Sequence, residues 1–389
     1  MTEDIYDIAI VGAGPSGSTA AYYIDSKYKV LILDKFSFPR PKACGGCLFY
    51  SRDWPLEFEN FSNIYERLNK FETKSIIFYS GEKKLFQVRT DHLYDKVSRM
   101  EMDNLLLQEA LKKNNVVFQK FNVQKITKIG NILELNDGRH IIRARKIIGA
   151  DGWDSVVARF IGNNRRTIDE FVNTLEYEIV CDRLSDQAHV FFVYGGELST
   201  AWLLPTNQGY YIGLGIQGKS RKSLKDNLDD LIQTCLAKEL IPNKFTISNR
   251  FGAPDPVSIR KIQCTDDVLL VGDALGTVSQ LSGEGIDFGM RSGKIAAAAL
   301  NENYSNSANI YKRKVKTVLK TLVIFPKPPR MIIVPIFKLF TAIMTSKLLP
   351  DIIRKRIQRW LFVKYSRSNK GFNQSLYNIL EEDVSGYSY

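Results

Sequence analysis

The sequence predicts an α/β (α+β) fold in which a doubly wound, mostly parallel sheet is combined with an antiparallel sheet and C-terminal helices. Short apolar runs alternate with helical stretches near both ends of residues 1–305, which indicates the parallel sheet. Alternating polar and apolar residues over 171–251 indicate the antiparallel sheet. The chain has 389 residues, 44% of them hydrophobic, which is enough for two such domains.

The first element is a strand, turn, helix and strand unit within residues 4–34. A buried strand is expected over 6–11, a helix over 18–26, and a second strand that ends at Asp34. The G-x-G-x-x-G turn between the first strand and the helix contains Gly12, Gly14, Pro15, Ser16 and Gly17. Glycines permit a tight turn and close approach of a pyrophosphate, and an acid at this spacing binds ribose hydroxyls. The unit therefore predicts a Rossmann-like dinucleotide site.

A loop rich in proline, glycine and basic residues follows Asp34. We expect its Lys35 and Arg40 to contact the phosphates of the dinucleotide. The loop ends in Cys44-Gly45-Gly46-Cys47, where nearby basic side chains favour a reactive thiol at Cys44. Loop packing is the ordinary alternative for Cys44, and a redox couple with Cys47 stays open. No second cysteine pair follows and the chain has three histidines, so no metal site is expected.

The remaining elements divide between the two sheets. A β-hairpin is expected over 74–88, a helix from Ser98 to about residue 114, and a helix over 224–239. Strands are expected over 116–118, 123–126, 132–135, 141–142, 146–152 and 268–274, and an alanine-rich helix over 286–301. The nucleotide-binding domain is assigned to 1–73, 91–165 and 255–305, the β-sheet substrate domain to 74–90 and 166–254, and a basic helical region to 306–389.

The net charge of +12 is concentrated near the C-terminus. Residues 308–370 contain sixteen Lys or Arg and one acid, interleaved with apolar runs that are too short to span a membrane. We expect amphipathic helices over 310–365 that lie on an anionic membrane surface, the alternative being a helical cap with a solvated basic face. Nucleic-acid binding is not expected. With no cleaved signal peptide expected, we predict a cytoplasmic protein at the inner face of the membrane.

Four stretches together resemble the FAD-binding signatures of the para-hydroxybenzoate hydroxylase-like flavoproteins. They are residues 12–17 with Asp34, Arg99 with Asp103, residues 149–152 with Ser155 and Arg159, and residues 272–274 followed by 283–285. The resemblance covers about residues 4–300 and implies that FAD is the cofactor.

The resemblance also implies roles for single residues. Arg99 is expected to pair with the pyrophosphate and Asp273 with the ribityl hydroxyls, and Val123 is expected to meet the adenine through its backbone. Asp151 is assigned to the cofactor from the second glycine-rich stretch. Gly285 and Ile286 begin a helix whose dipole stabilises negative charge on the flavin. A surface helix cap for Arg99 and an N-cap for Asp273 stay open.

Within this superfamily, two loops are similar to those of the geranylgeranyl reductase family, which saturates double bonds of isoprenoid chains. The loops are residues 39–46 and 281–286. The first is expected to lie over the flavin, with Cys44 as proton donor or flavin-adjacent contact. The family's substrate strand matches residues 200–206, where Trp202 and Pro205 remain but the leading aromatic and the terminal lysine are missing. This departure leaves the head group of the substrate open, and sheet core is the alternative role for Trp202.

The expected activity is therefore reduction of an isoprenoid double bond by hydride transfer from N5 of a reduced flavin. The external electron donor is expected to be NAD(P)H or a reduced ferredoxin-type carrier. A flavin monooxygenase or halogenase shares the FAD motifs and is the first alternative. A membrane-docked electron-transfer flavoprotein without alkene reduction is the second.

Overall fold

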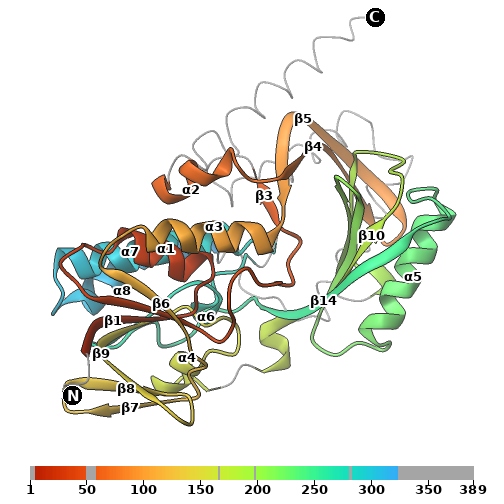
Figure 1. Ribbon diagram of the computed structural model, residues 1–389. Coiled ribbons are helices and arrows are strands. Elements are labelled where there is room, and N and C mark those ends of the chain that lie inside the picture. The colour runs from red at the N-terminus through yellow and green to blue at the C-terminus, as the bar shows by residue number, and fades with distance from the viewer. Residues whose placement is uncertain (1–4, 50–57, 165–166, 197–198, 280–282, 323–389) are drawn as a thin grey trace, which may run out of the picture.

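The computed structural model describes residues 5–49, 58–164, 167–196, 199–279 and 283–322. Within these residues the chain forms two sheets that lie at opposite ends of the molecule, with helices packed on each (Figure 1). The predicted fold class is confirmed, because one sheet is mainly parallel and the other mainly antiparallel.

The first sheet has seven strands within the described residues and contains the predicted nucleotide-binding unit. Its parallel strands are β1 (Ile5–Val11), β2 (Val30–Asp34), β6 (Val116–Lys120), β9 (Ile141–Gly149) and β15 (Val268–Leu270). They run in the order β6-β2-β1-β9-β15, and the antiparallel pair β7 (Lys125–Ile129) and β8 (Ile132–Asn136) extends from β9. Every residue of β2 is buried, as expected for a parallel strand covered on both faces.

Helices α1 (Pro15–Tyr23), α3 (Arg99–Leu111) and α7 (Ile286–Glu302) cover one face of this sheet (Figure 1). The shorter helices are α2 (Glu59–Tyr65), α4 (Val156–Phe160) and α6 (Gly272–Leu275). Helix α1 begins three residues earlier than expected, because Gly14 is extended and proline is favoured at the first helical position. Other boundaries also differ from the prediction. Residues 141–149 form one strand, so Asp151 lies in the following loop, and Val123 precedes β7. The strand expected over 268–274 ends at Leu270, and residues 272–275 form α6 instead.

The second sheet has eight strands in the described part of the chain, in the order β14-β10-β13-β12-β11-β4-β5-β3. These are β14 (Thr246–Pro256), β10 (Phe171–Val180), β13 (Gly209–Gln217), β12 (Ser199–Thr206), β11 (Ala188–Phe192), β4 (Lys70–Ser80), β5 (Lys83–Val97) and β3 (Cys47–Phe49). The expected hairpin is therefore longer than 74–88. Short 3₁₀ helices occupy Ile168–Glu170 and Tyr194–Gly196.

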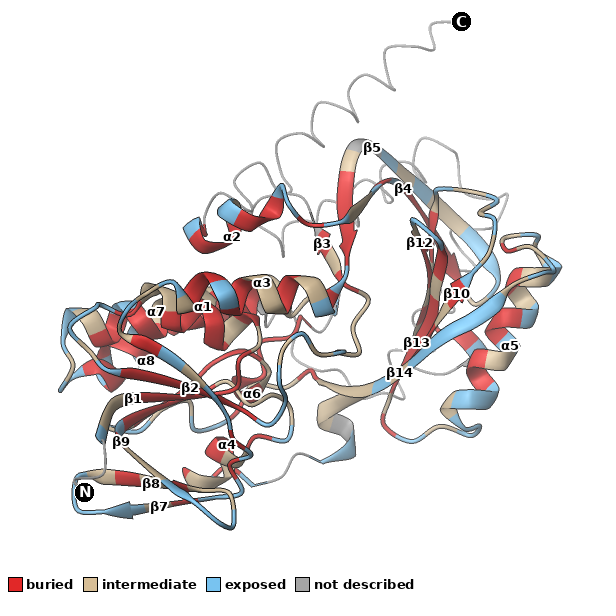
Figure 2. Cartoon of the chain, viewed as in Figure 1, coloured by how far each residue is buried: buried red, intermediate tan, exposed pale blue. Residues whose placement is uncertain are grey.

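The two faces of the second sheet have different neighbours. Helix α5 (Leu224–Ala237) packs on one face, where Leu228, Leu231 and Cys235 meet a cluster that includes Tyr210 and Ile212. Figure 2 shows this buried side of α5 turned toward the strands. The opposite face is turned toward the first sheet, and its alternate residues line the cavity described below.

Helix α8 (Ser307–Leu322) is the described start of the basic C-terminal region. Its apolar residues, among them Tyr311 and Val315, are buried in the core formed with the first sheet, while Lys312 and Lys316 are exposed. This part of the predicted 310–365 region thus packs its apolar face on protein rather than on lipid. Residues 323–365 lie outside the described residues. In the described part of the chain, no helix is long and apolar enough to span a membrane.

Candidate active site

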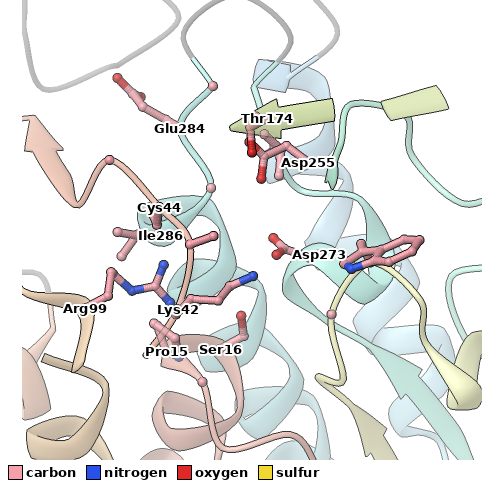
Figure 3. A pocket seen from close by; sticks show the side chains of 18 of the residues that line it. Pro15, Ser16, Lys42, Cys44, Arg99, Thr174, Asp255, Asp273, Glu284 and Ile286 are labelled. Carbon is pink, nitrogen blue, oxygen red and sulfur yellow. The ribbon is translucent and has the colours of Figure 1, made fainter. Parts of the chain in front are cut away.

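A cavity of about 880 Å³ lies between the two sheets and brings most of the predicted site residues together. Its lining includes Gly12, Gly14, Pro15, Ser16, Asp34, Lys35, Arg40, Cys44, Gly45, Arg99, Val123, Asp151, Trp202, Asp273, Gly285 and Ile286. Figure 3 shows Cys44, Ile286 and Arg99 on one side of the cavity, with Asp273 and Asp255 across from them. Gly17 and Pro205 lie outside this lining: Gly17 packs against the backbone at Gly12, and Pro205 is buried in β12.

The glycine turn forms one end of the cavity. Gly12 has φ +105°, and a Cβ there would collide with the carbonyl of Ala150, so the tight turn requires glycine. A Cβ on Gly14 would stand 3.6 Å from Nη2 of Arg40 and fill the space between turn and guanidinium. Gly14, Pro15 and Ser16 line the cavity at the start of α1, and the N-terminus of a helix stabilises an anionic phosphate.

Asp34 holds this turn in place. Its Oδ2 accepts a hydrogen bond from the Ala13 amide and its Oδ1 from the Phe36 amide, each at 2.9 Å. The carboxylate expected to bind ribose hydroxyls thus also fixes the turn before it and the loop after it. Each oxygen keeps a second lone pair for a hydroxyl.

Two arginines converge on the buried carboxylate of Asp103. Arg99 donates to it from Nε at 2.8 Å and from Nη2 at 3.0 Å, and Nη2 of Arg40 lies 3.5 Å from its Oδ2. Burial opposes charge on Arg99, but Asp103 and the Cys44 side chain outweigh it, so the pKa of Arg99 is raised. Arg99 therefore remains positively charged and can attract a pyrophosphate. Nε and Nη2 of its guanidinium group are, however, already hydrogen-bonded to Asp103.

The residues fit a flavin dinucleotide by an observation independent of the motifs. Nε of Arg40 is buried beside the glycine turn, 4.0 Å from Oδ2 of Asp34, and has no hydrogen-bond partner among the described residues. A buried donor without a partner costs free energy, which an acceptor such as a phosphate oxygen would remove. Arg40, the amides of the turn and the space at Gly14 together form a cradle for a diphosphate.

Asp273 and Asp255 face the middle of the cavity. Asp273 lies in the first turn of α6, and a Cβ on Gly285 would stand 3.6 Å from its Oδ1. Asp255 lies at the end of β14, where burial and the charge of Asp273 raise its pKa to about 7. Asp255 could not be predicted from the sequence, because a single acid between two prolines gives no periodic signal.

Asp151 has a structural partner at the edge of the cavity. Its Oδ1 accepts from the Ser155 hydroxyl at 2.5 Å and its Oδ2 from the Val157 amide at 3.2 Å, at the start of α4. Burial raises the pKa of Asp151. Helix α4 is therefore stabilised by this carboxylate, and binding of FAD by Asp151 stays a prediction.

The cysteine loop separates the nucleotide site from the second sheet. Sγ of Cys44 accepts from the Gly46 amide at 3.4 Å, and both Cys44 and Cys47 are free thiols. Burial strongly raises the pKa of Cys47, which keeps it protonated and makes it a poor partner in disulfide exchange. In the described residues, no cluster of three or more His, Cys, Asp or Glu could hold a metal ion.

The second sheet supplies an apolar side of the cavity, which we call the sheet wall. It is formed by Ile76, Phe78, Val190, Phe192, Trp202, Leu204 and the acidic residue Glu176. We call the opposite side, formed by the glycine turn, Asp34, Arg40, Arg99 and Asp273, the nucleotide wall. The cavity can thus hold a charged dinucleotide on one side and a hydrocarbon on the other.

Glu176 is the second residue that sequence analysis missed. It lies on β10, is 3% exposed, and accepts a hydrogen bond at its Oε2 from Nε1 of Trp202 at 2.8 Å. Burial raises the pKa of Glu176 to about 7, although Lys96 and Trp202 act in the opposite direction. An acid within an alternating strand looks like a surface residue, because the sequence does not show that both faces of this sheet are covered.

Comparison with known proteins defines the class. The family model described as "FAD binding domain" matches residues 95–312, and a second model, "Lycopene cyclase protein", matches residues 7–169. The first match covers more than half of the chain. The chain therefore belongs to the FAD-binding domain family, and its cofactor is FAD.

Individual relatives narrow this class. Digeranylgeranylglycerophospholipid reductase of Methanocaldococcus jannaschii is 28% identical over 330 residues, which cover 80% of this chain and 83% of the relative. The crystal structure of a geranylgeranyl bacteriochlorophyll reductase-like protein from Thermoplasma acidophilum superposes with a TM-score of 0.72 at 20% identity, covering 89% and 93% of the two chains. A flavin-dependent halogenase shares the fold with a TM-score of 0.67 at 18% identity, covering 94% of this chain and 72% of the halogenase. The chain is an FAD-dependent oxidoreductase, and it is similar to these geranylgeranyl-type reductases.

Proposed function

We propose that this oxidoreductase saturates carbon–carbon double bonds of an isoprenoid chain carried by a lipid, a quinone or a related prenyl compound. The observation that carries the proposal is the sheet wall, an apolar surface that continues the cavity away from the phosphate cradle. A hydrocarbon buried there loses contact with water, at about 25 cal/mol for each Å² of apolar surface. The names of the relatives support the same substrate class.

When bound, FAD in its reduced form supplies a hydride from N5, and the alkene also requires a proton. The chain contributes positioning and exclusion of water. Arg40, Arg99 and the glycine turn hold the diphosphate, Asp273 orients the ribityl chain, and the start of α7 after Gly285 stabilises negative charge on the ring. Cys44, which lies next to Ile286 and above Arg99 in Figure 3, acts beside the chemistry as proton donor or flavin-adjacent contact.

The external partners belong to the same proposal. NAD(P)H or a reduced ferredoxin-type carrier delivers the electrons, and the basic region over 310–365 holds the enzyme on the inner face of a membrane. The exposed cations of α8, including Lys312 and Lys316, support this, since each cation near an anionic surface contributes about 1 kcal/mol.

The test is anaerobic turnover. The purified protein is loaded with FAD, reduced chemically and mixed with a geranylgeranyl lipid. The mass of the lipid product is then measured by mass spectrometry. A gain of about two mass units for each reduced bond supports the reductase. The matched control is the same incubation with the flavin left oxidised. No mass gain in this test, but oxygen uptake in a separate aerobic assay with NAD(P)H and an aromatic or lipid substrate, would instead indicate a monooxygenase. Reducible FAD with neither result would indicate an electron carrier.

A further inference from the structure

Three neighbouring strands of the sheet wall form one row of contacts. Glu176 on β10 pairs in register with Gly213 on β13, and Gly213 pairs in register with Trp202 on β12. A Cβ on Gly213 would stand 2.7 Å from the indole of Trp202, so the indole lies flat over this glycine. The missing side chain in the middle strand lets Nε1 of Trp202 reach across the row to Oε2 of Glu176 at 2.8 Å.

The second oxygen of Glu176 has no role within the described residues. Its Oε1 is buried and has no hydrogen-bond partner there. Glu176 lines the cavity together with Val172 and Thr174, the alternate residues of β10, and a Cβ on Gly45 of the cysteine loop would stand 3.9 Å from its Oε2. The carboxyl group therefore lies at the junction of the sheet wall and the cysteine loop, with one oxygen oriented by Trp202.

We propose that Glu176, oriented by Trp202 across Gly213, is the acid that protonates the substrate alkene. This assignment rests on the proposed reductase function and makes Cys44 a contact of the flavin or substrate rather than the donor. One alkene carbon takes the proton from the carboxyl group of Glu176, and the other takes the hydride and its electron pair from reduced flavin. The π bond breaks and two C–H bonds form. The carboxylate is then reprotonated from water.

The surroundings of Glu176 favour a protonated carboxyl group near neutral pH. Burial is the main cause of its raised pKa, and Glu178 on the same strand adds to it, whereas Lys96 on β5 opposes it. Lys96 lies over the ring of Tyr211 at 3.6 Å, and Cys47 on β3 and Asp255 on β14 also face this region. A general acid donates a proton most effectively when its pKa lies near the pH at which the enzyme works.

The main experiment compares single-turnover reoxidation of FAD-loaded, reduced protein by a geranylgeranyl lipid across a pH series. The wild-type rate is expected to fall as pH rises above about 7, because the donor loses its proton. We call this fall in rate at high pH the pH limb. The Glu176→Gln variant is expected to bind FAD normally, to reoxidise about 100-fold more slowly and to lack the pH limb, whereas Glu176→Asp is expected to keep it. Glu178→Gln is the matched control on the same strand, outside the cavity. It is expected to keep the rate and the fall at high pH, with that fall moved slightly to lower pH because Glu178 raises the pKa of Glu176.

Two further variants separate positioning from proton donation. Trp202→Phe removes a hydrogen bond that favours the carboxylate, so its pH limb is expected to move to higher pH while FAD binding persists. Cys44→Ala is expected to keep the limb with less than about a tenfold loss of rate. A wild-type rate in Glu176→Gln would overturn the proposal, and loss of the limb in Cys44→Ala would transfer the donor's role to Cys44.

A second readout does not depend on turnover. Infrared difference spectra of the FAD-free protein against Glu176→Gln are expected to show a protonated carboxyl signal that titrates near pH 7. A carboxylate signal throughout that range would contradict the proposed donor. If this signal were present but the wild-type protein reduced no prenyl substrate, Glu176 would be a buried protonated acid, but both the proposed reductase function and its role as proton donor would be wrong.

Discussion

The nucleotide wall and the sheet wall of the cavity are constructed in different ways. On the nucleotide wall, neighbouring residues in sequence act together: the glycine turn, the Arg99–Asp103 pair one helical turn apart, and the acid that ends β2. On the sheet wall, Glu176, Gly213 and Trp202 meet only through strand register. A local motif can specify the first wall, whereas the second depends on correct pairing of three strands. We therefore expect mutations on the two walls to separate cofactor binding from catalysis.

The largest expected effect is on the nucleotide wall, in Arg99→Met. Asp103 is completely buried and, among the described residues, would keep only the more distant Arg40 as a cationic partner. Breaking a buried ion pair costs about 4 kcal/mol. We expect this loss in denaturant unfolding, together with loss of bound flavin absorbance. Arg99→Lys is the control and should retain part of the stability. Full stability and flavin content in Arg99→Met would mean that the ion pair does not organise this wall.

The second largest effect is expected for the Gly12→Ala variant, which changes the glycine turn. The positive φ and the collision with Ala150 are together expected to cost about 3 kcal/mol and to abolish FAD binding. Gly130→Ala is the matched control: it also has a positive φ, +58°, but nothing lies within 4 Å of its Cβ. The control should cost about 1 kcal/mol and bind FAD normally. Equal losses in both variants would show that backbone strain, and not the collision, dominates.

The third largest effect is expected for Gly213→Ala, a variant that changes the sheet wall and leaves the nucleotide wall intact. The added methyl group is expected to displace the indole of Trp202 and to cost about 2 kcal/mol, because overpacking forces neighbouring side chains off their rotamers. Flavin content should match the wild-type protein while turnover falls. The measurements are thermal unfolding, flavin absorbance and single-turnover rate on one preparation. Loss of flavin in this variant would break the proposed separation of the two walls.

The smallest effect is a pH dependence on the α5 side of the same sheet. Burial, with a smaller contribution from Lys84, lowers the pKa of His189 to about 4. The unfolded chain binds this proton at about pH 6.5, so stability is complete above that value and decreases as pH falls toward 4. Going from about pH 7 to about pH 5.5 should cost about 1 kcal/mol, measured by denaturant unfolding. In His189→Gln this contribution to the slope should vanish, and an unchanged slope would exclude His189 as its source.

The contrast between the nucleotide wall and the sheet wall also explains how much of the structure could be predicted from the sequence. The parallel sheet and the glycine turn could be predicted because their residues are close together in the chain, and most of the predicted site residues line the cavity. Glu176 and Asp255 did not, because the sequence does not reveal which strands pair or which face is covered by α5. Strand β3 was missed for a related reason: three residues at the sheet edge, paired only with β5, carry no periodicity.

The packing of α1 on α7 links the first turn of the chain to a segment near the end of the described residues. Gly293 and Gly289 of α7 lie against Ser16 so closely that a Cβ on either would meet it. During synthesis, the glycine turn emerges early but cannot gain this support until α7 has left the ribosome. Contacts so distant in the chain slow folding, since the intervening loop must close first. We therefore expect flavin to be acquired after nearly the whole chain has been made, and truncation before α7 to yield flavin-free protein.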